Sequence, residues 1–258
     1  MERRVESEAT VIGYVAQVLA GGMELMATGR CVGVALAAAV WPLAVGLHGC
    51  SGGADFGENV SLPQGQRHVV SGDLVQGHSL NLPGDRPFNV TDTQRHSEGR
   101  ATASSTATAT GSASCMADAS KGGSAVAEFQ IGHVLAYDGT SPFPATVTFN
   151  VAYYCTLKGY TPQYGDRPLG LKAYVMDSDR RMLGKIVLAE SDPDRVPDRW
   201  SGSQSPSFDV TFEPGLAYHL VVAGRVEVSG DDTMGAVATL NMRSLTIQIV
   251  PQRLETRD

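Results

Sequence analysis

The most constraining feature of the sequence is the segment 145–157, ATVTFNVAYYCTL, in which large apolar residues recur at every second position. Successive side chains of a β-strand point to opposite faces of its sheet. This period therefore predicts a strand with one buried face and one exposed face. The predicted buried face consists of Val147, Phe149, Val151, Tyr153, Cys155 and Leu157.

Other segments show the same period of two. The segments 207–213 (SFDVTFE) and 216–228 (LAYHLVVAGRVEV) both alternate, and Glu213-Pro214-Gly215 between them is a predicted turn. Pro presets φ in such a turn, and Gly accepts a positive φ. The Ala/Thr-rich segment 100–111 (RATASSTATATG) is predicted to form a flat strand, because Thr favours strands. Further strands are predicted at 125–131, at 169–176, at 182–189 and around Leu245, Ile247 and Ile249.

The alternation indicates about eight strands, and turn clusters separate them. This pattern predicts an all-β fold. We expect a two-sheet antiparallel β-sandwich at 100–251, with jelly-roll and immunoglobulin-like topologies both open, followed by a polar tail at 252–258. The preceding segment 50–99 is rich in Gly, Asp, Asn, Ser, Gln and Pro. Such a segment buries too little surface to offset the entropy of ordering, so it is predicted to be a tether.

The N-terminal region is typical of export signals. Residues 31–47 (CVGVALAAAVWPLAVGL) carry no charge, and Arg30 stands directly before them. A basic residue followed by an apolar run and small residues predicts a signal peptide at 26–49. A transmembrane anchor is the alternative, although the run is short for a span. Residues 1–25 are too long and too acidic to open a signal, so we expect translation to begin at Met26 or Met23 and 1–25 to be an upstream extension.

The end of the apolar run, Leu47-His48-Gly49-Cys50, resembles the lipobox of bacterial lipoproteins. The resemblance implies that the Cys50 thiol takes a diacylglyceryl group and becomes the membrane anchor at the mature N-terminus. It implies a cell-envelope location, on the outer membrane if the organism has one, because Ser51 replaces the Asp that marks inner-membrane retention. Otherwise the location is the outer face of the cytoplasmic membrane. The alternative is an ordinary signal peptide.

Two cysteines remain in the predicted mature domain, Cys115 and Cys155. An even number of cysteines in an exported chain predicts one disulfide between them. The alternative is a pair of buried free thiols that behave as small apolar side chains.

Charge excludes one class of partner. Lys and Arg number 20 and Asp and Glu 27, which gives a net charge of −7, whereas a nucleic-acid partner would need a basic face. No Ser-His-Asp spacing is convincing and no P-loop occurs, so no catalytic residue is predicted.

Carboxylates gather in two predicted turns, at Asp177-x-Asp179 and Asp192-x-Asp194. Such oxygens are the ligands that Ca²⁺ prefers, which makes these turns weak candidates for a calcium site. The arginines between them favour the alternative of solvated turns with surface ion pairs.

Aromatic residues form a third candidate site. Rings stack on the apolar faces of sugars, and loops at the ends of a sandwich often carry binding. The candidate glycan-contacting residues are Tyr154, Tyr160, Tyr164 and Trp200.

The Ala/Thr-rich strand and the Phe212-x-x-Gly215-x-x-Tyr218 strand entry resemble the β-sandwich domains of secreted bacterial surface proteins. We expect a membrane-anchored envelope or surface lipoprotein whose non-catalytic β-sandwich contacts a glycan or an envelope protein. The alternatives are a secreted hydrolase, whose carboxylates meet only in the fold, and a calcium-stabilised adhesion module.

Overall fold

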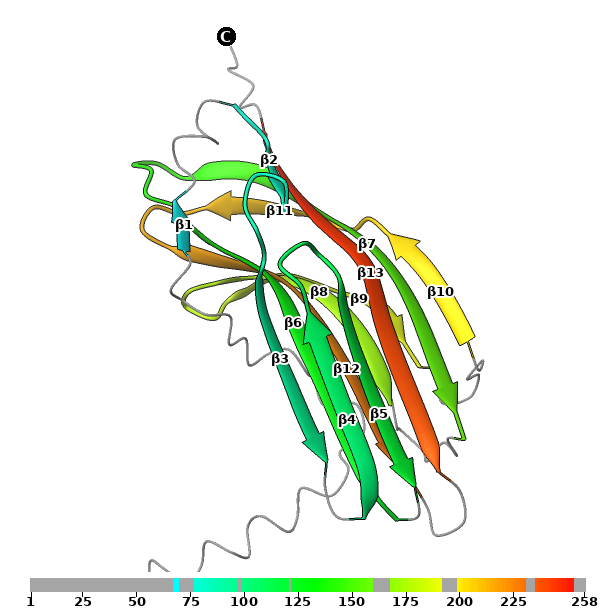
Figure 1. Ribbon diagram of the computed structural model, residues 1–258. Helices are drawn as coiled ribbons and strands as arrows, with labels where there is room; N and C mark the ends of the chain where they lie inside the picture. The colour runs from blue at the N-terminus through cyan, green and yellow to red at the C-terminus, as the bar shows by residue number, and fades with distance from the viewer. Residues whose placement is uncertain are drawn as a thin grey trace, which may run out of the picture. The chain divides into compact units, whose positions relative to one another are not determined.

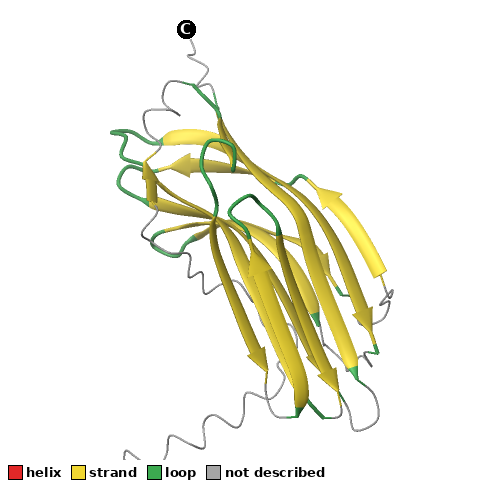
Figure 2. Cartoon of the chain, in the orientation of Figure 1, coloured by secondary structure: helices red, strands yellow, loops and turns green. Residues whose placement is uncertain are grey.

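The computed structural model describes residues 67–69, 77–96, 99–120, 122–159, 168–191, 199–230 and 235–252. The chain divides into two units, 1–49 and 50–258, and all described residues belong to the second. They form strands, turns and loops in two sheets, as Figure 1 and Figure 2 show. Most of their buried apolar side chains form one main core, and a smaller second cluster consists of Val134, Tyr174, Ala217, Val221 and Ala223. The predicted all-β sandwich is therefore confirmed. No helix long and apolar enough to cross a membrane occurs among these residues.

Thirteen strands occur in the described residues, where the alternation predicted about eight. They are β1 (Arg67–Val69), β2 (Leu80–Leu82), β3 (Asn89–His96), β4 (Arg100–Ala107), β5 (Ala113–Ser120), β6 (Ser124–Ala136), β7 (Phe143–Lys158), β8 (Leu169–Asp177), β9 (Met182–Glu190), β10 (Arg199–Gln204), β11 (Ser207–Phe212), β12 (Ala217–Ser229) and β13 (Ala236–Pro251).

The strands divide into two sheets. Sheet A has the order β6-β12-β8-β9, and β1 and β3 both pair with the remaining edge of β6. Sheet B has the order β7-β13-β5-β4, with β10 and β11 sharing the remaining edge of β7 and β2 pairing with β13. Every pair is antiparallel except β1 with β6.

The unpredicted strands come from segments with few large apolar residues. The predicted strand at 100–111 ends already at Ala107, as β4. The unpredicted strand β5 follows and pairs with β4 as a hairpin. The strands β1, β2 and β3 lie within the predicted tether 50–99, so the prediction is wrong for that part of the tether. The sequence of β3, NVTDTQRH, buries little, and main-chain pairing with β6 holds it in the sheet. Trp200 lies in the strand β10, which was not among the predicted strands.

The core lies between the two sheets and is built from the alternating faces of the strands. The predicted buried face of 145–157 is confirmed, because all six of its large apolar side chains are buried in β7. The ring of Phe149 meets that of Phe208 edge to face at 5.8 Å between centroids. Burying one such large apolar side chain stabilises the fold by about 1.5–3 kcal/mol.

Side chains also close the two sides of the sandwich. Gln204 of β10 donates from Nε2 to the carbonyl oxygen of Leu188 on β9 at 2.6 Å, which joins the edges of the two sheets. On the other side, Ser105 of β4 donates from Oγ to the carbonyl oxygen of Glu128 on β6 at 2.7 Å. Each contact gives a main-chain oxygen a hydrogen-bond donor from the opposite sheet.

The predicted disulfide is not present, because Cys115 and Cys155 are both free and buried. Each cysteine is paired with Leu240 of β13, from opposite sides of that strand. Neighbouring strands lie about 4.8 Å apart, so the two Cα atoms are separated by roughly 9.5 Å across two strand spacings. A disulfide needs a Cα separation of about 4.4–6.8 Å. The intervening β13 is the physical reason why no bond forms.

Candidate functional site

Tyr154 and Trp200, both predicted to contact a glycan, lie on opposite faces of sheet B. Trp200 pairs with Cys155, whose side chain is buried, and its ring packs against the core. Tyr154 pairs with Ser201 and occupies the other face, where it is part-exposed. The two rings therefore do not form one platform. Tyr160, Tyr164 and the predicted anchor Cys50 lie outside the described residues.

The face that carries Tyr154, here called the outer face of sheet B, is covered mainly by hydroxyl and amide side chains. Asn150 donates from Nδ2 to Thr246 Oγ1 at 3.2 Å, and the hydroxyls of Thr148 and Ser207 lie 2.8 Å apart. Hydroxyls and amides both donate and accept hydrogen bonds, as sugar hydroxyls do. Other members of this face, by strand register, are Thr102, Ser104, Thr106, Ser114, Thr146, Thr156, Ser201, Ser203, Thr239, Asn241, Ser244 and Gln248.

A β-bulge in β13 places a basic side chain beside Tyr154. Met242 pairs with Tyr153 and Ser244 with Ala152, so Arg243 has no partner on β7. The extra residue makes Arg243 and Ser244 exposed in succession, whereas exposed and buried residues otherwise alternate there. The Arg243 guanidinium carbon lies 5.5 Å from the centroid of the Tyr154 ring, which is a cation–π contact.

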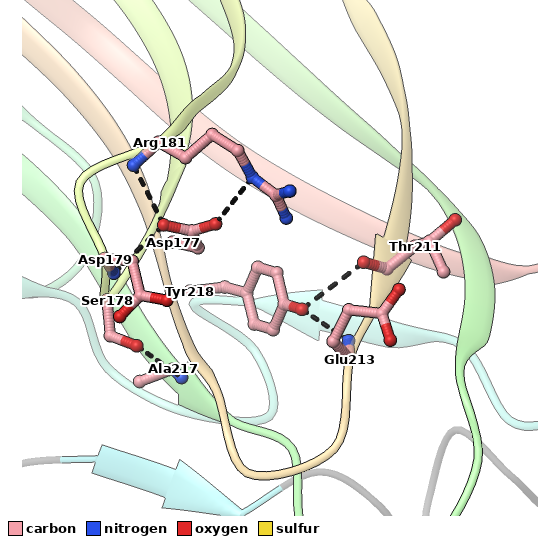
Figure 3. A network of polar contacts seen from close by, with 8 residues as sticks. All are labelled: Asp177, Ser178, Asp179, Arg181, Thr211, Glu213, Ala217 and Tyr218. Carbon is pink, nitrogen blue, oxygen red and sulfur yellow. Dashed lines mark hydrogen bonds and ion pairs between the residues drawn. The ribbon is translucent and has the colours of Figure 1, made fainter.

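The candidate calcium residue Asp177 holds the turn between β8 and β9, as Figure 3 shows. Its Oδ1 accepts the main-chain N–H groups of Asp179 at 3.0 Å and Arg181 at 2.9 Å. Its Oδ2 accepts Arg181 Nε at 2.9 Å, and the Asp177 side chain is 1% exposed. Both carboxylate oxygens are thus engaged within the turn, where Arg180 has a positive φ of 64°.

Asp179 contributes its main-chain N–H to this turn, and its side chain is exposed. The structure therefore assigns the Asp177-x-Asp179 motif a role in closing a hairpin. Asp192 and Asp194 lie outside the described residues. Across the ranges that the structure describes, no three His, Cys, Asp or Glu side chains form a group that could hold a metal ion.

The predicted turn at Glu213-Pro214-Gly215 is confirmed and leads from β11 in sheet B to β12 in sheet A. Gly215 has a φ of 79° there. Tyr218 fastens this crossing, because its Oη accepts the Glu213 main-chain N–H and donates to the Thr211 carbonyl oxygen at 3.3 Å (Figure 3). Burial raises the pKa of Tyr218, and the hydrogen bond from Glu213 opposes the shift. The neutral hydroxyl is thus the form that holds the turn.

No protein-family model matches the chain, and no curated protein matches it. Among solved structures, the enzymatically active domain of tailspike protein 4 from bacteriophage CBA120 is similar at a TM-score of 0.23 and 10% sequence identity. The similarity covers 64% of this chain and 20% of that chain, so the chain spans one fifth of the length of the phage protein domain. A likeness of this size carries no functional conclusion.

Proposed function

We propose that this chain is a membrane-anchored envelope or surface lipoprotein whose β-sandwich binds a glycan without catalysis. The binding surface is the outer face of sheet B around Tyr154. The observation that carries the proposal is the part-exposed Tyr154 ring, which stands among hydroxyl and amide side chains with Arg243 at 5.5 Å. An exposed ring stacks on the apolar face of a sugar, and its polar neighbours bond the sugar hydroxyls.

Binding is proposed in preference to hydrolysis because of the residues next to Tyr154. Hydrolysis of a glycosidic bond uses two carboxyl groups that flank the bond, about 5–10 Å apart. The described neighbours of Tyr154 on its face include Ala152, Thr156, Ser201, Asn241 and Arg243, and none of these five carries a carboxyl group.

The anchoring part of the proposal is supported by the sequence Leu47-His48-Gly49-Cys50. The mass of the N-terminal peptide from membrane-fractionated protein tests it. A diacylglyceryl-modified peptide that begins at Cys50 is expected. An unmodified N-terminus near residue 1 in a soluble fraction would overturn the anchoring.

Glycan binding is tested with the full chain on an array of neutral and acidic oligosaccharides, with Tyr154→Ala and Tyr154→Phe beside the unsubstituted protein. We expect binding that is lost in Tyr154→Ala and kept in Tyr154→Phe, because phenylalanine retains the stacking ring. Loss of one stacked ring corresponds to roughly a tenfold weaker affinity.

A matched control is Met116→Ala, which removes another large exposed apolar side chain from the same face, on β5. This variant should bind as the unsubstituted chain does. Absence of binding to every oligosaccharide by the unsubstituted chain, or equal binding by Tyr154→Ala, would overturn the proposal.

A further inference from the structure

Basic side chains gather around Tyr154 on the outer face of sheet B. Arg243 is the bulge residue that contacts its ring at 5.5 Å. Arg199 of β10 pairs with Thr156, the next residue of β7 on this face, so its Cα lies diagonal to that of Tyr154 at about 7–8 Å. Lys158 follows on the same strand and face, about 13–14 Å from Tyr154. All of these basic residues are exposed.

Within the described ranges, no ion pair joins Arg243, Arg199 or Lys158 to a carboxylate. The ion pairs of the described residues include those of Arg181 with Asp177 and of Arg225 with Glu128 and Glu227. Two carboxylates lie on the described part of this face. Asp118 of β5 shares the register row of Lys158, two strands away, and Asp209 of β11 pairs with Thr146 near the start of β7. Among the described residues, Arg243 and Arg199 thus form a local excess of positive charge beside Tyr154, which favours an anionic ligand.

Resting on the glycan binding proposed above, we infer that the ligand is a carboxylated glycan, of the class of polymers of hexuronic acid. The sugar stacks on the face of the Tyr154 ring opposite the Arg243 guanidinium, and the guanidinium binds the carboxylate that this sugar carries. Arg199 and Lys158 meet carboxylates of neighbouring sugar residues along the same chain.

The bulge makes this geometry available. A guanidinium that contacts an aromatic face keeps its N–H donors at its edge, where they form two parallel hydrogen bonds with a carboxylate. The residues opposite the bulge on β7 and next to it on β13, Ala152 and Ser244, are small. They leave room for a ligand beside the ring of Tyr154.

The test uses the full chain and two probes with the same sugar backbone, an oligogalacturonate and its fully methyl-esterified form, in which each carboxylate is replaced by an uncharged methyl ester. The unsubstituted chain is expected to bind the acid form at least about tenfold more tightly than the ester, and added salt should weaken only the acid form. Arg243→Gln should abolish the preference, and Arg199→Gln should reduce it. Arg95→Gln, which removes an exposed positive charge from β3 of sheet A, is the matched control and should change nothing.

The outcomes separate this inference from the proposal on which it rests. Equal affinity for both probes, lost in Tyr154→Ala, would retain glycan binding and overturn recognition of the carboxylate. Binding to neither probe or to any array glycan would overturn both. Vesicles of phosphatidylglycerol serve as a third probe. Binding to these vesicles without binding to oligogalacturonate would overturn the inference and assign the basic residues to a lipid surface.

Discussion

Cys115 and Cys155 lie directly opposite Leu240, one on each side of β13. Both point into the core of the sandwich, and burial raises the pKa of the Cys155 thiol from 9.0 to about 12. Burial also raises the pKa of Cys115, and the neighbouring Cys155 adds to the shift. These thiols act as small apolar side chains in the folded protein.

The first prediction concerns thiol reactivity. In a variant with Cys31 and Cys50 replaced by serine, Cys115 and Cys155 should not react with iodoacetamide in the folded state, because the reactive thiolate is absent and the sulfur is buried. Both should react in urea without any reductant. Mass spectrometry of the alkylated chain measures this, and a requirement for reductant in urea would show that a disulfide exists.

The second prediction concerns alkaline stability. The folded state holds the Cys155 proton more tightly than the unfolded state, so the stabilisation is complete below pH 9 and is lost as pH rises towards 12. The urea midpoint of the unsubstituted chain should therefore fall more steeply over this range than that of Cys155→Ala. Equal slopes for the two chains would contradict the shifted pKa.

The third prediction concerns the turn between β8 and β9. Asp177→Ala removes the acceptor of two main-chain N–H groups and of Arg181 Nε. Leaving such groups unpaired costs about 1–3 kcal/mol of unfolding free energy, measured by urea denaturation. Asp179→Ala is the control, because its exposed side chain should contribute little. An equal loss in both variants would mean that Asp177 does not hold the turn.

The fourth prediction concerns a glycine in the core. A Cβ atom at Gly224 would lie 2.4 Å from the ring of Phe129 and 2.7 Å from Leu240 Cδ2. Gly224→Ala should therefore lower the unfolding free energy by about 1–3 kcal/mol through overpacking. Gly84→Ala, where the nearest atom is 3.5 Å away, should be close to neutral. Thermal denaturation compares the two, and a stable Gly224→Ala would show that the core relaxes around the methyl group.

Strands with large apolar residues at every second position could be predicted from the sequence. In β7 the period is carried by Phe, Tyr, Val and Leu, so its buried face was predictable residue by residue. The segment of β12 also alternates, but Ala217, Val221 and Ala223 on its other face are buried too, so the alternation did not predict an exposed face there. The strands β3 and β10, NVTDTQRH and RWSGSQ, carry short polar side chains and Gly. Their place in the sheet depends on main-chain pairing with a distant strand, which leaves no period in the sequence.

The candidate site was predictable only in part. Strand parity placed Tyr154 on the outer face, and that placement is confirmed. The partners of a strand are a property of the whole topology, so the sequence could not place β13 between Cys115 and Cys155. Arg243 was missed for the same reason, because a bulge is defined only against the partner strand. The sequence offered one signal of the bulge, because Arg243 and Ser244 are two successive polar residues in a segment where apolar residues otherwise alternate.

The bulge in β13 allows the side chain beside Tyr154 on the outer face to change without a change in the core side chains of the same strand. Without Arg243, Met242, Ser244 and Leu245 would still point inward, outward and inward. Loss or gain of this one residue would thus remove or add the cation beside Tyr154, while every core side chain of β13 would still point into the core. An insertion elsewhere in β13 would reverse every later residue. Homologous chains, or engineered ones, can therefore differ by one residue at this position and present chemically different surfaces on the same sandwich.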